Sequence, residues 1–310
     1  MGQGLLYELP KPENIREGWP WTEESVVETA PADRNLPKIS IITPSYNQGE
    51  FLEETIRSVL LQNYPNLEYI IIDGGSTDNS VEIIRKYEKW LTFWKSEPDK
   101  GQSDAINQGF DKATGLYGNW INSDDYLTKN ALWNFSQIIG GYPSETLFIG
   151  YSQYTDKEGT KLWHKKGQIK TIEELLDLKN FWRKNTTIAQ QSVMFNIDTF
   201  KKAGGLNENN HYSMDFELWG DLLILGNKIE YIEFPIGVFR KYDGQKISFH
   251  IKATKSLVSA TKKLVLKNRS FAFRQKTLFY WNTIVFQYLY LYRSFRSRIG
   301  IRRRLKKALN

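Results

Sequence analysis

Runs of apolar residues alternate with helix-like segments over the first 125 residues. The segments Ile39–Thr43, Leu67–Ile72 and Leu116–Ile121 are rich in apolar residues and predict buried strands. Between the first two, apolar residues recur every three or four positions over Glu50–Gln62, which predicts an amphipathic helix. The same reasoning predicts helices over Val81–Trp90 and Asp104–Ala113 and a short strand over Leu91–Lys95. Strands that alternate with helices indicate an α/β fold with a mostly parallel, doubly wound sheet.

The pattern loosens after Tyr126. It predicts helices over Asn130–Ile139 and Met214–Leu225 and strands over Thr146–Gly150, Ile188–Phe195 and Lys228–Phe234. Before residue 37 the chain is polar and rich in proline, which predicts an extended arm. We expect this arm to lie on the domain, because Trp19 and Trp21 need a surface to cover.

Charge is distributed unevenly along the 310 residues. Residues 251–310 contain 16 Lys and Arg and no Asp or Glu, so the remaining 250 residues carry a net charge of −9 although the whole chain carries +7. No stretch of about 18 uncharged apolar residues occurs, and the first residues lack the pattern of a signal peptide. The absence of cysteine excludes disulfides and thiolate chemistry.

Polar side chains follow each of the main predicted strands. Asp73 closes the second strand, and the pair Asp124 and Asp125 follows the strand that ends at Ile121. Parallel strands bring their carboxyl ends to one edge of the sheet, where open α/β sheets bind ligands. Adjacent carboxylates invite Mg²⁺ or Mn²⁺, because such ions bind one or two carboxylates together with substrate phosphates.

Four motifs in this order carry a family resemblance. They are ISIITPSYNQ (39–48), EYIIIDGGSTDNS (68–80), SEPDKGQSDAINQGF (96–110) and NWINSDD (119–125). Over about residues 37–248 the chain resembles the family 2 glycosyltransferases. The resemblance implies a GT-A fold, a Rossmann-like sheet, and inverting transfer of a sugar from a UDP-, GDP- or dTDP-sugar donor. It divides the chain into an arm (1–36), a catalytic domain (37–250, with a nucleotide-binding half to residue 125 and an acceptor-binding half after it) and a basic, aromatic helical tail (251–310).

The resemblance also implies roles on the donor side. Asp73 would contact the nucleobase, Asp125 would be the main metal ligand, and Asp124 would be a second contact to metal or ribose. Asn122 stands where many relatives carry the first Asp of an Asp-x-Asp signature. The other residues placed along the donor are Pro44, Tyr46, Asn47, Lys100, Asp104 and Arg240. Asp104 also has a simpler interpretation, as the acidic residue that begins a helix.

On the acceptor side, YSMDFELW (212–219) resembles the motif that carries the general base. Asp215 is the matching residue, and Glu217 is a second carboxylate close by. Gln190 and Gln191 resemble an acceptor-lining segment, although both could equally be strand surface. In FRKYDGQKIS (239–248), Lys246 joins Arg240 as a candidate phosphate partner, and Tyr242 stands where many relatives have His.

The tail favours contact with an anionic membrane surface, because aromatic and aliphatic residues precede a run of Arg and Lys. Packing of the tail on the catalytic domain or in a homodimer is one alternative. Binding to nucleic acid is another, but nothing outside the basic tail favours it. We therefore expect a cytoplasmic glycosyltransferase at the inner face of the membrane, acting on a glycan or lipid-linked acceptor in cell-surface polysaccharide synthesis. A non-catalytic nucleotide- or glycan-binding protein on a decayed transferase fold remains a second interpretation.

Overall fold

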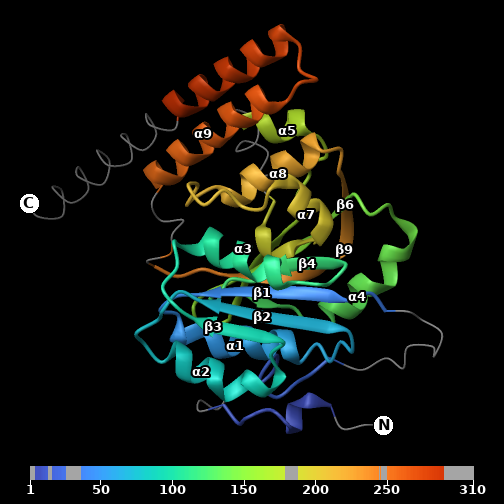
Figure 1. The fold of residues 1–310 in the computed structure, drawn as a ribbon, viewed down its shortest axis with the longest axis vertical. Coiled ribbons are helices and arrows are strands. Elements are labelled where there is room, and N and C mark those ends of the chain that lie inside the picture. Colours follow the sequence, from blue (N-terminus) through green and yellow to red (C-terminus); the bar gives the residue numbers. More distant parts are fainter. Residues whose placement is uncertain are drawn as a thin grey trace, which may run out of the picture.

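A central sheet organises this computed structural model, which describes residues 4–12, 16–25, 36–178, 188–243, 245 and 250–289 (Figure 1). Within these residues the sheet has nine strands in the order β3-β2-β1-β4-β8-β6-β9-β5, with β7 paired to β6. The strands are β1 (Ile39–Ser45), β2 (Leu67–Asp73), β3 (Phe93–Ser96), β4 (Tyr117–Trp120), β5 (Tyr126–Leu127), β6 (Thr146–Thr155), β7 (Lys161–Lys165), β8 (Val193–Asn196) and β9 (Lys228–Arg240).

The first half of the sheet is parallel and covered on both faces. Strands β1 to β4 pair in parallel, and alternate side chains of β1 enter different cores. Ile42 packs in the core beneath α3 (Gln102–Lys112), whereas Ile41 packs in the core shared with α1 (Gly49–Leu60). Figure 1 shows α3 above this part of the sheet and α1 with α2 (Ser80–Tyr87) below it. The predicted doubly wound α/β fold is therefore confirmed.

Two details of the predicted strands are wrong. The first strand, predicted to end at Thr43, continues to Ser45 and pairs Pro44 with Ile72. The strand predicted over Ile188–Phe195 begins only at Val193, and Gln190–Ser192 forms a 3-10 turn instead. The sequence pattern does not separate this turn from a strand, because Gln190–Ser192 is as buried as the strand that follows it.

The second half of the sheet is mixed. β8 pairs antiparallel with both β4 and β6, and β6 and β9 pair in parallel with shifts of register. Sequence reasoning missed β5, β7 and the helices α5 (Ile172–Leu176) and α7 (Ile197–Ala203), which are all short. The two predicted helices of this half appear as α4 (Ala131–Ile138) and α8 (Met214–Ile224).

The described part of the N-terminal arm lies against α1. The buried guanidinium of Arg57 donates hydrogen bonds to the backbone carbonyls of Pro10, Pro20 and Trp21, at 3.0–3.1 Å. The Trp19 indole N–H donates to the carbonyl of Leu127 at 2.8 Å. The buried Arg57 cation fixes the arm to the helix through these three carbonyls, because buried donors need hydrogen-bond partners.

The tail contributes a helical hairpin that packs on α8. It consists of α9 (His250–Lys267) and a helix over 273–289 (Figure 1). The close approach needs Gly220, because a Cβ there would lie 2.4 Å from Leu264 Cδ1. Apolar residues of the hairpin belong to the same buried cluster as those of α8. No helix among the described residues is long and apolar enough to cross a membrane.

Candidate functional site

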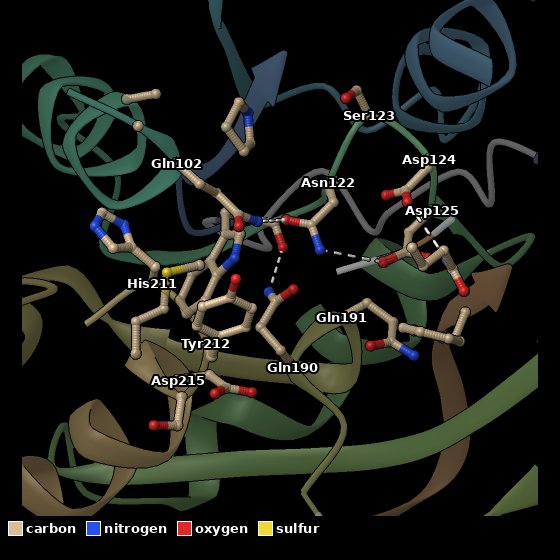
Figure 2. A pocket seen from close by; sticks show the side chains of 18 of the residues that line it. Gln102, Asn122, Ser123, Asp124, Asp125, Gln190, Gln191, His211, Tyr212 and Asp215 are labelled. Carbon is tan, nitrogen blue, oxygen red and sulfur yellow. Dashed lines mark hydrogen bonds between the residues drawn. The ribbon is translucent and has the colours of Figure 1, made fainter. Parts of the chain in front are cut away.

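A cavity of about 1110 Å³ opens at the carboxyl ends of β1, β2 and β4. Its donor-side wall includes Pro44, Tyr46, Gly74, Lys100 and the segment 122–125. Its other walls come from the segment 188–191, the start of α8 and the inner side of α9. Figure 2 shows Asn122 to Asp125 at one end of the cavity and His211, Tyr212 and Asp215 at the other, with Gln190 between them. One cavity therefore joins most of the residues that the sequence placed on two separate segments.

The acidic pair lies in a tight turn after β4. The Asp125 carboxylate is buried and accepts hydrogen bonds from the backbone N–H of Arg240 at 3.1 Å and from the Asn122 amide at 3.3 Å. Burial, together with the neighbouring charge of Asp124, raises the pKa of Asp125 well above its usual range. A cation bound here would offset both the cost of burying the Asp125 charge and the repulsion between the two carboxylates.

The donor set suits a divalent cation shared with a phosphate ligand. No group of three or more His, Cys, Asp or Glu that would hold a metal alone occurs among the described residues. Magnesium, however, usually binds one or two carboxylates and takes its other oxygens from substrate phosphates and water. Asp124 and Asp125 both line the cavity, so they fit this kind of site.

Asn122 connects the acidic pair to helix α3. Its side-chain oxygen accepts a hydrogen bond from the Gln102 amide at 2.7 Å, and its own amide donates to Asp125 (Figure 2). A first-position Asp would place a third negative charge here, whereas Asn supplies both a donor and an acceptor. The substitution therefore orients Asp125 without adding charge.

Tyr242 contacts the acidic pair from the far side. Its hydroxyl donates to Asp124 Oδ2 at 2.9 Å, and its ring packs on Phe51 with centroids 4.8 Å apart. Burial, with the Asp124 charge, raises the pKa of Tyr242, so the phenol stays protonated and remains a donor. The sequence showed only that Tyr242 stands where relatives have His. It could not show the hydrogen bond to Asp124, because the two residues are 118 positions apart.

Arg240 does not face the cavity as the sequence predicted. Its buried guanidinium bonds to the Glu54 carboxylate at 2.9 Å, the Lys157 carbonyl at 2.8 Å and the Asp124 carbonyl at 3.1 Å. The expected contact with donor phosphate is therefore replaced by a structural role, in which Arg240 holds the turn that carries the acidic pair. Lys246, the other candidate phosphate partner, lies outside the described residues.

Asp73 and Asn47 organise the loops at the nucleobase end. The Asp73 carboxylate accepts hydrogen bonds from the N–H and the hydroxyl of Ser76 and from the hydroxyl of Ser96, at 2.6–2.8 Å. Asn47 has a left-handed backbone, with φ of 51°, and its side chain accepts from the Thr77 N–H. Neither side chain lines the cavity, whose wall here is formed instead by the buried Pro44 and the exposed ring of Tyr46. In this structure both residues shape the site from behind.

Lys100 and Asp104 occupy the start of α3. The Lys100 ammonium is exposed at the cavity and lies 3.7 Å from Glu208. Asp104 is outside the cavity and accepts a hydrogen bond from the Lys100 backbone N–H at 2.9 Å. Although burial acts in the opposite direction, this hydrogen bond lowers the pKa of Asp104. Asp104 therefore stabilises the first turn of the helix, which was the simpler interpretation of its sequence position.

Gln190 and Gln191 both line the cavity, but most of their polar atoms bind the protein. Gln190 donates to the Asn119 side chain at 3.0 Å and to the Trp120 carbonyl at 2.5 Å, and Gln191 donates to Ser152. The buried Gln190 Oε1 has no hydrogen-bond partner among the described residues. This oxygen is therefore an acceptor that a ligand in the cavity could use.

The predicted catalytic residue and its neighbour lie on different sides of α8. Asp215 lies in the first turn of the helix and lines the cavity (Figure 2). Glu217 is buried away from the cavity, where it accepts hydrogen bonds from Asn207, Asn210 and Lys263. Its contacts give Glu217 a structural role, which replaces the acceptor binding predicted from its closeness in sequence.

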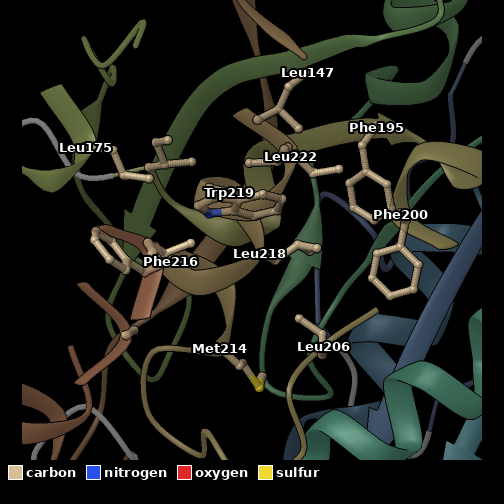
Figure 3. Packing of buried hydrophobic residues seen from close by; sticks show 14 of the residues in the cluster. Leu147, Leu175, Phe195, Phe200, Leu206, Met214, Phe216, Leu218, Trp219 and Leu222 are labelled. Carbon is tan, nitrogen blue, oxygen red and sulfur yellow. The ribbon is translucent and has the colours of Figure 1, made fainter. Parts of the chain in front are cut away.

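Apolar side chains form the floor beneath Asp215. Trp219 stacks on Trp120 with centroids 5.8 Å apart, and Figure 3 shows Trp219 surrounded by Phe216, Leu218 and Leu222. The Met214 sulfur accepts a hydrogen bond from the Ser103 hydroxyl at 2.8 Å, which ties α8 to α3. This packing fixes the start of α8 against the donor half of the molecule.

Comparison with known proteins identifies the family. A model described as glycosyl transferase family 2 matches residues 40–202. This chain belongs to glycosyl transferase family 2. The matched segment contains the acidic pair and the two glutamines, and it ends before Asp215.

Several curated relatives of this family 2 chain are glycosyltransferases. An uncharacterized glycosyltransferase of Rickettsia typhi is 28% identical over 59% of this chain and 58% of its own length. Glycosyltransferase GlyG of Streptococcus pneumoniae is 27% identical over 73% of this chain and 79% of its own. The putative teichuronic acid biosynthesis glycosyltransferase TuaG of Bacillus subtilis is 35% identical over 41% of this chain and 51% of its own.

Solved structures share the fold. TarS (residues 1–349) of S. aureus in complex with UDP-GlcNAc superposes with a TM-score of 0.61 at 17% identity, over 78% of this chain and 70% of that one. The mannosyltransferase PcManGT of Pyrobaculum calidifontis, in complex with GDP-Man and Mn²⁺, gives 0.57 at 14% identity over 88% and 81%. The expected GT-A fold is confirmed by these similarities.

Proposed function

We propose that this family 2 chain transfers a sugar from a nucleoside-diphosphate sugar to a hydroxyl group, with inversion of the anomeric carbon. The observation that carries the proposal is the single cavity that joins a buried acidic pair to Asp215. Such a cavity offers a place for a diphosphate at one end and a base for an incoming hydroxyl at the other. The complexes of similar structures with UDP-GlcNAc and GDP-Man support this class of donor.

The donor would lie along the wall from Pro44 to Asn122. Pro44 and the exposed ring of Tyr46 offer a surface for the base, while Asp73 and Asn47 hold the two loops that frame it. Lys100 is an exposed cation on this wall, just before α3. Its ammonium group would bind the negative charge of the donor phosphates. UDP, GDP and dTDP are the candidate nucleotides. Contacts with Pro44 and Tyr46 would distinguish their bases.

Asp125 and Asp124 would hold Mg²⁺ or Mn²⁺ beside the diphosphate. When bound, the ion supplies Lewis-acid neutralisation of the leaving diphosphate. The protein prepares this position in advance, because Arg240, Asn122 and Tyr242 bond to the backbone or carboxylates of the pair. Preorganised ligands spare the site from reordering when the donor binds.

Asp215 would remove the proton from the acceptor hydroxyl. The acceptor oxygen forms a bond to the anomeric carbon as the bond from that carbon to the diphosphate oxygen breaks, and the proton passes to the Asp215 carboxylate. Attack from the side opposite the diphosphate inverts the anomeric centre. The position of Asp215 in the first turn of α8 stabilises its ionised form, so geometry has to provide most of the activation.

The acceptor side would be formed by Gln190 and Gln191, with the apolar floor beneath them. We propose a glycan or lipid-linked acceptor in cell-surface polysaccharide synthesis, at the inner face of the membrane. The similarity to TuaG supports a role of this kind. A homodimer is compatible with the proposal but is not required by the site, because the residues assigned to it come from one chain.

Thermal shift measurements test the donor site. The purified full-length protein is titrated with UDP, GDP, dTDP and CMP, each with and without Mn²⁺, and Asp125→Ala is measured in parallel. We expect a metal-dependent shift with one nucleotide, lost in the variant. Hydrolysis or transfer of the matching sugar donor then separates an enzyme from a non-catalytic binding protein, which would show the thermal shift without turnover. No shift with any of the nucleotides would contradict the proposed donor site.

A further inference from the structure

The last described helix, over 273–289, is apolar on two opposite sides. On its inner side, Phe279, Thr283 and Phe286 are buried in the hairpin. On its outer side, four large side chains recur at helical spacing with exposed fractions of 55, 63, 49 and 69%: Leu278, Trp281, Ile284 and Tyr288. Spacings of three, three and four residues place these four side chains in one stripe, which we call the outer face. Figure 1 shows this helix, in red, at the edge of the molecule farthest from α1.

An outer face of this composition needs a partner. A surface helix of a soluble protein normally carries polar residues on the side opposite its packed face, and large contiguous apolar patches mark sites of interaction. Nothing among the described residues covers the outer face, since all four side chains stay about half exposed or more. Phe279 and Phe286 are buried and hold the helix in the hairpin. The apolar side chains of the outer face are therefore not needed to hold the helix in place.

Charge indicates which partner suits the outer face. The segment 251–310 carries 16 basic and no acidic side chains, and eight of the basic residues follow the helix, from Arg293 to Lys307. Trp and Tyr combine an apolar ring with a polar group, which suits the boundary between lipid headgroups and acyl chains. Basic side chains next to such a face are attracted to anionic headgroups. A second copy of this chain would instead bring an equally basic segment against the first.

We propose that the outer face docks on the surface of an anionic lipid bilayer. The four side chains enter the headgroup boundary while the helix lies in the plane of the surface, as an amphipathic helix does. The helix does not cross the bilayer, in agreement with the absence of a spanning helix among the described residues. The basic residues that follow add electrostatic attraction, which salt weakens.

The same hairpin forms part of the cavity wall. Ala253, Thr254 and Leu257 of α9 line the cavity. Helix α9 therefore lies between the cavity and the helix that carries the outer face. Docking therefore places the acceptor side of the cavity, rather than the donor side, next to the bilayer. This geometry favours an acceptor that carries a lipid anchor. The link to the acceptor rests on the proposed function, whereas the docking surface does not.

Vesicle co-sedimentation of the full-length protein tests the docking surface. Vesicles of phosphatidylcholine alone are compared with vesicles that contain about 30% phosphatidylglycerol, at low and high salt. We expect binding to the anionic vesicles that falls as salt rises. The double variant Leu278→Ser/Trp281→Ser should weaken partitioning about tenfold or more, because both side chains would leave the interface. Leu116→Ser is the matched control: Leu116 is 49% exposed just before β4, where its backbone bonds to Lys38 beside β1, and its loss should change nothing.

Three outcomes would overturn the proposal. The first is equal binding of the double variant and the wild type at unchanged melting temperature. The second is a wild-type dimer that the double variant converts to monomer, without vesicle binding by either. The third is no vesicle binding at all by a monomeric wild type. The nucleotide-induced thermal shift is measured on the same samples, so that a failure of docking is distinguished from a failure of the proposed donor site.

Discussion

The Glu54 carboxylate lies 2.9 Å from the Arg240 guanidinium, and both side chains are almost fully buried. Glu54 belongs to α1 and Arg240 ends β9, so the pair joins two segments far apart in the sequence directly behind the acidic turn. Arg240 in turn bonds to the Asp124 carbonyl and, through its backbone N–H, to the Asp125 carboxylate. Arg16 of the N-terminal arm bonds to the same Glu54 oxygen at 2.9 Å. The arm, α1 and β9 therefore converge on the pair of residues proposed to bind the metal.

Loss of the Glu54 charge should weaken metal-dependent donor binding. In Glu54→Gln the Arg240 charge stays buried without its partner, which is costly and allows the acidic turn to shift. We expect the Mn²⁺ concentration for half-maximal nucleotide binding to rise about tenfold, equivalent to about 1.4 kcal/mol, as measured by thermal shift or calorimetry. Arg240→Lys should act in the same direction, because the single nitrogen of Lys cannot reach the three partners that Arg240 binds through three separate nitrogens.

Glu53→Gln is the control for this prediction. Glu53 is the neighbouring residue of α1, but it bonds to Lys86 and Tyr87, on the side away from the acidic turn. Its loss should lower stability without a change in the metal requirement. If Glu54→Gln and Glu53→Gln lower the melting temperature alike and leave the metal requirement unchanged, Glu54 only stabilises the fold.

Asp215→Asn should abolish most of the transfer reaction and leave donor binding intact. Removal of a general base typically costs a factor of about 10² to 10⁴ in rate. Because Asp215 and the acidic pair lie at different ends of the cavity, the nucleotide-induced thermal shift should equal that of the wild type (Figure 2). Steady-state kinetics with saturating donor measures the first effect. Retention of more than about a tenth of kcat would remove Asp215 from the role of base.

Tyr242→Phe removes one hydroxyl that donates to Asp124. The ring can keep its packing on Phe51, so we expect a small change in stability, of about 1 kcal/mol, and a weaker apparent affinity for the metal. Tyr242→His restores a donor at this position and should recover part of the affinity. Metal titrations of donor turnover compare the three proteins, and equal metal affinity in all of them would contradict the prediction.

Glu217 should make the stability of the hairpin depend on pH. Burial raises its pKa, but hydrogen bonds from Lys263, Asn210 and Asn207 outweigh burial, and the net pKa lies below the ordinary value of 4.5. A group whose pKa is lowered on folding stabilises the folded state above its unfolded pKa, and this contribution is lost as the pH falls below about 4.5. Glu217→Gln should therefore cost about 1–3 kcal/mol at neutral pH.

Chemical denaturation across pH 3–8 measures this contribution. The difference between the wild type and Glu217→Gln should be constant at neutral pH and should shrink as the solution is acidified. Activity per folded molecule should stay unchanged, since Glu217 lies outside the cavity. A difference that grows on acidification would have the wrong sign for a carboxylate with a lowered pKa.

The strands and the acidic pair could be predicted because their signals are local. The apolar segments that predict β1 and β2 need burial on both faces, and Asp125 follows β4 within a few residues. The roles of Arg240, Glu217 and Tyr242 could not be read in this way. Arg240 looks like a phosphate ligand in sequence, and only its burial against Glu54 shows otherwise. Glu217 lies two residues from Asp215, a separation that places two side chains on different sides of a helix.

Local sequence patterns were enough to predict the α/β fold, the family and the edge of the sheet where the cavity opens. These properties follow from hydrophobic periodicity and from motifs a few residues long. Which polar side chains face the cavity, which support it from behind, and which side of the last described helix is exposed became known only from the packing of the folded chain. The direction of a side chain depends on partners far away in the sequence, which local patterns do not contain: Glu54 for Arg240, Lys263 for Glu217 and Asp124 for Tyr242.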